Sequence, residues 1–177
     1  SISMILGTFA PAIDSCGATL ASTYYDAPYS SGNQQVLNWW GNPYLGYNNI
    51  RQAITYSMNV ISARCLTSLV SDSTAYDYLE LFGLGSADLF KASSSLASTS
   101  QSYTVTNEML TAAFASIAND GIYQKPTYYT KVLDRHGNIL LESVPSQTRI
   151  IKSSSAALLT NAMEDVISSD SSYYYQY

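Results

Sequence analysis

Charged side chains are scarce in this sequence. Lys, Arg, Asp and Glu make up 12% of its 177 residues, about half of the usual share of roughly 25%. The eight Lys and Arg residues are spread singly along the chain, so they form no basic patch that could neutralise a phosphate backbone. Nucleic acid is therefore not an expected partner. Ser, Thr, Asn, Gln and Tyr supply the polar surface instead, a bias that suits a secreted or surface-exposed protein.

Long apolar runs are also missing. No run reaches the about 20 residues that a helix needs to cross a bilayer. The first residues, SISMILGTFAPAID, contain an apolar stretch without a positive segment before it, so they do not resemble an intact signal peptide. Hydrophobic residues still make up 46% of the chain. We therefore expect a globular fold, and the length suits one domain with a core of its own.

Cysteine and histidine are too few for most metal or disulfide chemistry. The chain has two cysteines, Cys16 and Cys65, and one histidine, His136. Two cysteines cannot build a disulfide framework or a zinc site. We interpret them as two buried thiols, although a single bridge between them is possible. One histidine does not readily supply a Ser-His-Asp triad or a histidine metal cluster, and we expect no metal site.

Most of the chain has the pattern of helices. Apolar residues recur at helical spacing in residues 4–14, 50–66, 73–83, 107–119 and 153–167. The first helix is expected to end near Pro11 or shortly after it, the third at Gly83, and the fourth at Asp120-Gly121. A serine among residues 153–155 should cap the last helix.

Only one segment has the pattern of a strand pair. Residues 127–143 alternate, turn at residues 135–138 and alternate again, which predicts a small antiparallel hairpin. Because a two-stranded ribbon is marginal alone, either further strands lie outside this chain or the helices carry the core. The Ser-rich residues 89–104 are expected to form a loop, and residues 168–177 a loose tail. The predicted fold class is α+β, mainly helical.

A long segment without helical pattern, residues 21–47, is rich in tyrosine and holds both tryptophans. Loops longer than about 15 residues are usually functional or disordered, and the tryptophans argue against disorder. Four aromatic side chains could line a groove that binds a sugar or a peptide: Trp39, Trp40, Tyr44 and Tyr47. They could equally pack the loop onto the domain, which we favour. Asp26 is the one acid within this loop that merits inspection.

Two polar side chains, Ser57 and Asn59, interrupt the apolar pattern of AITYSMNVISARC, residues 53–65. They could be structural, with the serine bonding back to a helix carbonyl and the asparagine capping the next helix. Alternatively, they could face a cleft. A three-residue Ser-x-Asn motif decides nothing by itself, so its surroundings matter.

Several segments resemble, in sequence and in order, the transpeptidase domain of class A penicillin-binding proteins. They are APAID, YYDAPYSSGNQQVLNWWGNPYLGYNNIRQAITYSMNVISARC, LFGLGS, MLTAAFASIANDGIYQKPTYYTKVLDRHGNIL and LLTNAMEDVI. The similarity extends over residues 1–167, which we expect to form a partial transpeptidase domain of that family's β-lactamase-like fold. That family uses three motifs, S-x-x-K, S-x-N and K-T-G.

The resemblance assigns roles to individual residues. Ser57 and Asn59 match S-x-N and would be the pair that relays protons and holds the substrate. Ser1 stands at the nucleophile position of S-x-x-K, but Met4 stands where the lysine belongs, and a thioether has no proton to exchange. K-T-G does not occur, and we expect most of the family's sheet to lie beyond residue 177.

Three explanations of SISM remain open. The chain could be a degenerate, non-catalytic copy, or a truncated or corrupted version of an active enzyme that has lost its lysine. Alternatively, Ser1 could use its own α-amine, whose pKa is near 8, as the base.

The resemblance implies a function. Intact relatives cross-link peptidoglycan stem peptides that end in D-Ala-D-Ala through a serine ester, outside the cytoplasmic membrane, and β-lactams trap that serine. No metal or organic cofactor is implied, and any membrane anchor would precede residue 1. We expect this chain as given to be inactive. The alternative is a non-catalytic binding or scaffolding domain at the cell surface, built on the same fold.

Overall fold

The computed structural model describes residues 4–85 and 105–168, and helices dominate these residues. The helices are η1 (Met4–Phe9), α1 (Ala10–Asp14), α2 (Ile50–Thr55), α3 (Asn59–Cys65), η2 (Leu66–Val70), α4 (Asp72–Leu81), α6 (Asn107–Ala118) and α7 (Ser153–Ser168). The strands are β1 (Thr23–Asp26), β2 (Tyr29–Ser31), β3 (Gln34–Val36), β4 (Gly46–Asn49), β5 (Ile122–Gln124), β6 (Lys131–Leu133), β7 (Ile139–Glu142) and β8 (Gln147–Arg149). The strands pair in twos, so the fold is α+β and mainly helical, as predicted.

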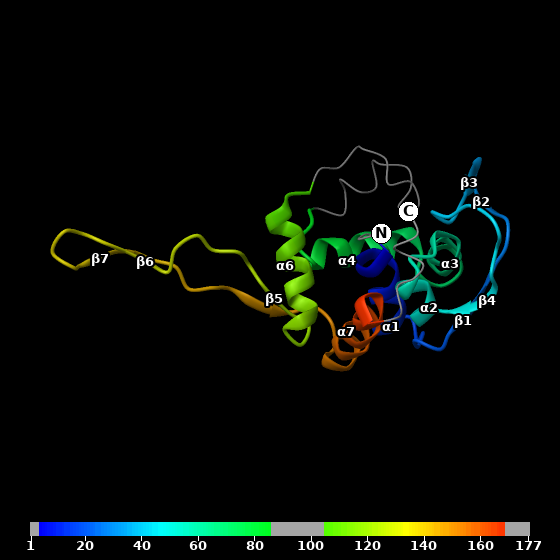
Figure 1. Cartoon of the computed structure of the whole chain (residues 1–177). Helices are drawn as coiled ribbons and strands as arrows, with labels where there is room; N and C mark the ends of the chain where they lie inside the picture. The colour runs from blue at the N-terminus through cyan, green and yellow to red at the C-terminus, as the bar shows by residue number, and fades with distance from the viewer. Residues whose placement is uncertain (1–3, 86–104, 169–177) are drawn as a thin grey trace.

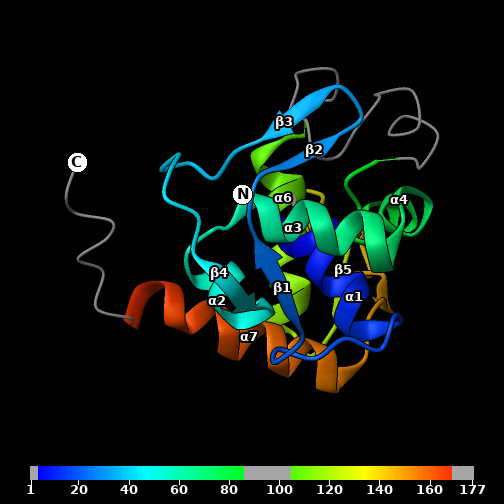
Figure 2. The same ribbon diagram turned by 90° about the vertical axis from the view of Figure 1, so that its right-hand side faces the viewer.

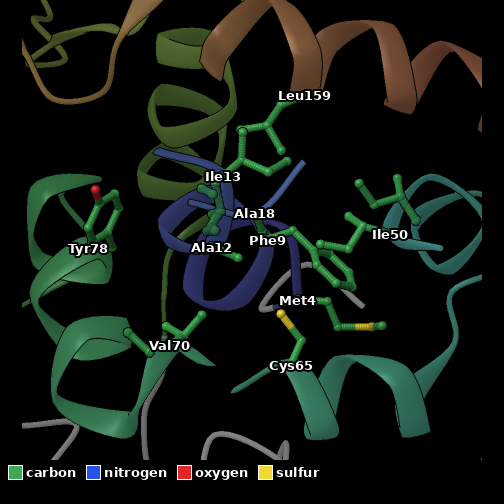
Figure 3. Close-up of a cluster of buried hydrophobic side chains, with 14 of the residues drawn as sticks. Met4, Phe9, Ala12, Ile13, Ala18, Ile50, Cys65, Val70, Tyr78 and Leu159 are labelled. Carbon is green, nitrogen blue, oxygen red and sulfur yellow. The ribbon is translucent and has the colours of Figure 1, made fainter. Parts of the chain in front are cut away.

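The first helical segment lies at the centre of the core. Its sequence is almost wholly apolar, and Leu6, Phe9 and Ala10 are inaccessible to solvent. Figure 3 shows side chains from α2, α3, α4 and α7 gathered around Phe9 and Ile13. The prediction of a buried helix is confirmed, although the helix continues past Pro11 to Asp14 because proline is tolerated in the first turn of α1.

The helical pattern over residues 50–66 is divided into two helices, α2 and α3, and the division lies where Ser57 and Asn59 interrupt the apolar pattern. The side chain of Asn49 accepts a hydrogen bond from the backbone N–H of Gln52, whose own side chain accepts from the N–H of Asn49, so a capping box starts α2. The chain then leaves helical geometry at Ser57, where φ is +52°, before α3 begins.

The aromatic loop is more ordered than its sequence suggested. β1 pairs with β4 and β2 pairs with β3, both antiparallel. Gly32-Asn33 is the two-residue turn between β2 and β3, a known hairpin signal that the loop interpretation did not weigh. The expectation of an irregular segment over residues 21–47 is therefore wrong in part. Strands of only three or four residues are too short to show a clear alternating pattern in the sequence.

A ribbon of four strands projects from the helical body (Figure 1). We call residues 122–149 the arm. β5 pairs with β8 at its base and β6 pairs with β7 beyond, both antiparallel. The predicted hairpin, β6–β7, is confirmed. The pairing of β5 with β8 at the base of the arm was not predicted. In Figure 1 the arm and the β2–β3 hairpin lie at opposite ends of the molecule.

The remaining helices agree with expectation apart from one cap. α4 is followed by Gly83 at φ +74°, and α6 stops before Asp120-Gly121. α7 runs along one side of the body (Figure 2) and begins at Ser153, so the serines form its first turn instead of preceding it. The segment 89–104 and all but the first residue of the predicted tail lie outside the described residues.

The two thiols agree only partly with expectation. Cys65 is buried, as predicted, whereas Cys16 is only partly buried. Neither cysteine is in a disulfide. His136 is exposed in the turn at the end of the arm, as its position in the sequence indicated.

Candidate functional site

The turn between α2 and α3 holds both members of the Ser-x-Asn motif. Ser57 has the left-handed φ of +52°, which costs a residue other than glycine of order 1 kcal/mol. Two backbone hydrogen bonds shape the turn, from the N–H of Ser57 to the carbonyl of Ile54 (3.2 Å) and from the N–H of Met58 to the carbonyl of Ala53 (2.9 Å). Met58 is fully buried and fastens the turn to the core.

The side chain of Ser57 meets that of Met4. The Ser57 hydroxyl donates a hydrogen bond to the Met4 thioether sulfur at 3.9 Å. Met4 begins η1 and is 7% exposed, so the contact lies at the edge of the core. The structure thus brings together position 4 and the S-x-N serine, which are 53 positions apart. A thioether accepts hydrogen bonds weakly and cannot take up a proton under ordinary conditions.

Asn59, the first residue of α3, faces the aromatic loop. Its side-chain N–H group donates to the backbone carbonyl of Leu37 at 2.9 Å. The neighbouring loop residue, Asn38, is buried, and its side-chain oxygen accepts a hydrogen bond from the backbone N–H of Val60 at 3.1 Å. Sequence reasoning missed Asn38 because a single asparagine in a loop carries no distinguishing pattern.

A buried carboxylate lies behind this contact. Asp26 is 1% exposed and accepts from the Asn38 side chain through both oxygens, at 2.9 and 3.1 Å. It also accepts from the backbone N–H of Leu45 at 2.8 Å. Three N–H bonds therefore satisfy a group that would be costly to bury without partners. Asp26 stood out in the sequence as the acid of the aromatic loop. In the structure its carboxylate binds two other residues of that loop, Asn38 and Leu45.

Two of the predicted substrate-binding residues, Trp39 and Trp40, are anchored through their indole N–H groups. The Trp39 indole donates to the backbone carbonyl of Tyr56 at 3.0 Å, and the Trp40 indole donates to that of Pro43 at 3.0 Å. The two rings meet edge to face with centroids 5.4 Å apart. Trp39 is 44% exposed beside the Ser57 turn, and Tyr44 is half-buried. A role of these side chains in substrate binding stays a prediction.

A pocket of about 410 Å³ opens beside Ser57. Its lining comes from η1, α2, the turn after α2, α6 and α7. It consists of Met4, Ile5, Phe9, Ala53, Ile54, Ser57, Phe114, Met163, Val166 and Ile167. Among the described residues that line it, Ser57 has the one polar side chain, so this part of the pocket can hold apolar groups and offer a hydroxyl to them. Ser1, the expected nucleophile, lies outside the described residues.

Two further findings bear on the character of the site. Among residues 4–85 and 105–168, no three His, Cys, Asp or Glu side chains are grouped as a metal site requires. In the same residues, no helix has both the length and the apolar character needed to span a membrane.

Comparison with known proteins identifies the family. Residues 6–176 match the profile of the family described as penicillin-binding protein transpeptidase domain. The chain belongs to this family. The matched stretch includes Ser57 and Asn59, whereas Ser1 and Met4 precede it.

Individual relatives agree with this assignment. Penicillin-binding protein 1A of Clostridium botulinum is 32% identical over 167 residues, which cover 89% of this chain and 20% of the relative. Penicillin-binding protein 1A of Streptococcus oralis is 29% identical over 164 residues, covering 90% of this chain and 25% of the relative. The chain thus spans between a fifth and a quarter of the length of these curated relatives.

A solved structure shows the same fold. The crystal structure of penicillin-binding protein 1A from Haemophilus influenzae superposes with a TM-score of 0.78 at 21% identity, covering 96% of this chain and 30% of the other. The penicillin-binding transpeptidase fold predicted from the resemblance is therefore confirmed.

Proposed function

We propose that this chain is part of a D,D-transpeptidase domain of peptidoglycan synthesis that acts outside the cytoplasmic membrane. Its substrates would be stem peptides that end in D-Ala-D-Ala, and β-lactams would be its inhibitors. Family membership supports the reaction class. The observation that carries the proposal for this chain is the hydrogen bond from the Ser57 hydroxyl to the side chain at position 4.

The proposed reaction is an acyl transfer through a serine ester. The Ser1 hydroxyl oxygen attacks the carbonyl carbon of the penultimate D-Ala, a base takes the hydroxyl proton, and the terminal D-Ala leaves as its amine gains a proton. The amine of a second stem peptide then attacks the ester, forms the cross-link and releases Ser1. Ser57 would pass protons between the base and the leaving amine, while Asn59 would hold the substrate amide.

Met4 is the weak point of this mechanism. A lysine at position 4 could accept the proton of Ser1 and pass it to Ser57, and methionine can do neither. Loss of a general base typically costs on the order of 10²- to 10⁴-fold in rate. We therefore expect the chain with Met4 to form the serine ester very slowly.

A second function is favoured by the same residue. With methionine at position 4, the described lining of the pocket beside Ser57 is apolar apart from Ser57 itself. A non-catalytic domain at the cell surface could use this cleft to bind a stem peptide without cleaving it. Such a domain would bind β-lactams reversibly and would not open their ring.

The test is the intact mass of the purified chain after incubation with excess benzylpenicillin, with a Met4→Lys variant in parallel. Opening of the β-lactam ring by Ser1 adds one whole benzylpenicillin, since the ring nitrogen takes the proton and no group leaves. We expect an adduct on Ser1 in Met4→Lys and at most a trace with Met4. A Ser1→Ala, Met4→Lys double variant is the control and should give no adduct.

The other outcomes each decide against a part of the proposal. A full adduct with Met4 would mean that Ser1 has another base, such as its α-amine. No adduct on either form would contradict the acyl-transfer function of this chain. Reversible binding by calorimetry without any adduct would favour the binding domain.

A further inference from the structure

Three consecutive residues of the aromatic loop form hydrogen bonds to residues before and after Ser57. We infer that Leu37–Trp39, the clamp, sets the backbone conformation of this turn, and that Asp26 holds the clamp in place. These are positioning residues, because they act on the motif through its backbone and through Asn59. Their role in acylation rests on the proposed function, whereas their role in shaping the turn does not.

Each clamp residue makes one hydrogen bond to a residue that flanks Ser57. Before the turn, the Trp39 indole donates to the carbonyl of Tyr56 at 3.0 Å. After the turn, the Leu37 carbonyl accepts from the side chain of Asn59 at 2.9 Å, and the Asn38 side chain accepts from the N–H of Val60 at 3.1 Å. The two sides of the turn are thereby tied to one short piece of chain.

The helix that follows the turn, α3, begins without a side-chain cap from its own N-cap residue. It continues directly into η2, so the helical segment spans residues 59–70. Its N-cap residue is Met58, which has no side-chain oxygen and makes no capping bond. The N–H of Val60 is one of the four donors at a helix start that lack a partner within the helix. Asn38 supplies the missing cap from 22 positions away.

Asp26 fixes the direction of the Asn38 amide. A carboxylate only accepts hydrogen bonds, so the side-chain N–H₂ group of Asn38 must face Asp26, at 2.9 and 3.1 Å. The Asn38 oxygen must then point the other way, toward Val60. Asp26 also binds the N–H of Leu45, so it joins the two ends of the loop that carries the clamp.

A clamp of this kind would maintain the left-handed φ of Ser57. That conformation persists only where surrounding contacts fix the backbone on both sides. The clamp supplies those contacts through Tyr56 and Val60. When the turn is fixed, the Ser57 hydroxyl faces position 4 and Asn59 stands beside the loop.

The first experiment measures amide hydrogen exchange of the chain as it exists and of Asn38→Ala. We expect exchange at residues 56–60 to speed up by about tenfold or more, because the variant removes the cap on the N–H of Val60 and both bonds from Asn38 to Asp26, which makes local opening easier. Exchange in α6 should change by much less. Asn33→Ala, in the exposed β2–β3 turn of the same loop, is the matched control and should leave all rates unchanged.

A milder variant keeps the test decisive if Asn38→Ala does not fold. Trp39→Phe retains an aromatic ring and removes the indole N–H that binds Tyr56. It should accelerate exchange at residues 56–58 by a few fold. Unchanged exchange at residues 56–60 in a folded clamp variant would overturn the inference.

The second experiment tests the link to acylation in the Met4→Lys background. Asn38→Ala should lower the rate constant of acylation by benzylpenicillin by about tenfold or more, because the turn loses its cap and Asp26 loses both bonds from Asn38. The initial binding constant should change less. Tyr78→Phe, which loses a buried bond elsewhere, controls for general destabilisation and should not show this split.

The two experiments distinguish the proposed function from the clamp. If Met4→Lys never forms an adduct, the proposed function fails and the exchange rates still decide the clamp. If exchange at residues 56–60 rises while acylation stays as fast, the clamp shapes the turn but the positioning role in catalysis is wrong.

Discussion

A single buried carboxylate joins three parts of the helical body. Asp14, at the end of α1, accepts a hydrogen bond from the Tyr78 hydroxyl of α4 at 2.7 Å and another from the backbone N–H of Lys152, just before α7, at 2.8 Å. The Lys152 ammonium donates to the Asp14 carbonyl. Helices that are distant in sequence therefore share one polar anchor inside an apolar core.

The Asp14 anchor makes stability depend on pH. Burial pushes the pKa of Asp14 upward, but the hydrogen bonds from Tyr78 and Lys152 and the Lys152 charge outweigh it and hold the pKa below its usual value. A depressed folded-state pKa stabilises the fold above the unfolded-state pKa of about 3.9, and this stabilisation is lost as the pH falls through the folded-state pKa.

Tyr78→Phe should therefore lower the free energy of unfolding by about 1.5–3 kcal/mol at pH 7, the range for hydrogen bonds to charged groups. Burial raises the pKa of Tyr78 to about 12, so it is a neutral donor throughout this range. The difference should shrink below about pH 4 as Asp14 becomes protonated. Urea unfolding at pH 7 and pH 3 measures it, with Tyr129→Phe on the arm as control. An equal loss at both pH values would contradict this account.

The two thiols should differ in reactivity. Burial, with the neighbouring Cys16, raises the pKa of Cys65 to about 11 against a smaller opposite effect of Tyr24, so Cys65 carries almost no thiolate at pH 7.5. Cys16 is partly exposed. N-ethylmaleimide should label one thiol in the folded chain and two in urea, as measured by intact mass. Cys16→Ser should abolish the fast label; absence of any label before reduction would instead indicate a disulfide.

At the scale of elements, the junction between α6 and the arm depends on one glycine. Gly121 has φ +78°, and a Cβ atom there would collide with the carbonyl oxygen of Ile151. Gly137, at the turn of the arm, has φ +85° but open space around it. The two positions share the left-handed backbone and differ only in packing.

Alanine at these glycines separates strain from collision. Gly137→Ala should cost about 1–2 kcal/mol of local backbone strain and hardly change the melting temperature of the body, because the turn lies at the end of the arm. Gly121→Ala should cost more than about 3 kcal/mol, since it adds a backbone collision to the same strain. Thermal unfolding of both variants by circular dichroism measures the difference. Equal melting temperatures would show that the junction can shift to accept a Cβ atom.

Elements with a local signal were predictable from the sequence. The α6 helix ends where Asp120-Gly121 provides a left-handed stop, and the β6–β7 turn follows from the alternation around residues 135–138. Strands β1 and β4 were missed because they are held by long-range contacts, of which Asp26 makes several, whereas the β2–β3 hairpin has a local signal in Gly32-Asn33. No sequence pattern shows which backbone and side-chain groups a single buried carboxylate such as Asp26 will bind.

The candidate site was predictable only in outline. The Ser-x-Asn pair stood out because Ser57 and Asn59 break an apolar pattern, and the family resemblance pointed to position 4. The clamp was invisible in the sequence: Leu37, Asn38 and Trp39 act through backbone carbonyls and single side-chain atoms that bind partners about 20 positions away.

In the whole molecule, the helical body and the arm differ in how far they bury their apolar side chains. Most buried apolar side chains come from the helices, from Met4 in η1 to Ala162 in α7, and a few, such as Leu20 and Ile151, come from the connections between them. The arm exposes its apolar side chains: Leu133, Ile139, Leu140, Leu141 and Val144 are each more than half exposed. Its outer strands pair only with each other (Figure 1). The body therefore carries the stability, and the arm adds exposed apolar surface.

Shortening the arm tests this division of the molecule. Thr130 and Ser143 face each other, since the Ser143 N–H donates to the Thr130 carbonyl at 2.9 Å, so Asn-Gly can replace Lys131–Glu142 as a two-residue turn. The free energy of unfolding in urea should change by less than about 0.5 kcal/mol, and self-association in sedimentation velocity should fall with the exposed apolar surface. Replacing Arg135 alone by Ser, which keeps that surface, is the control. A loss above about 2 kcal/mol would mean that the arm stabilises the body, because surface changes without packing partners do not cost that much.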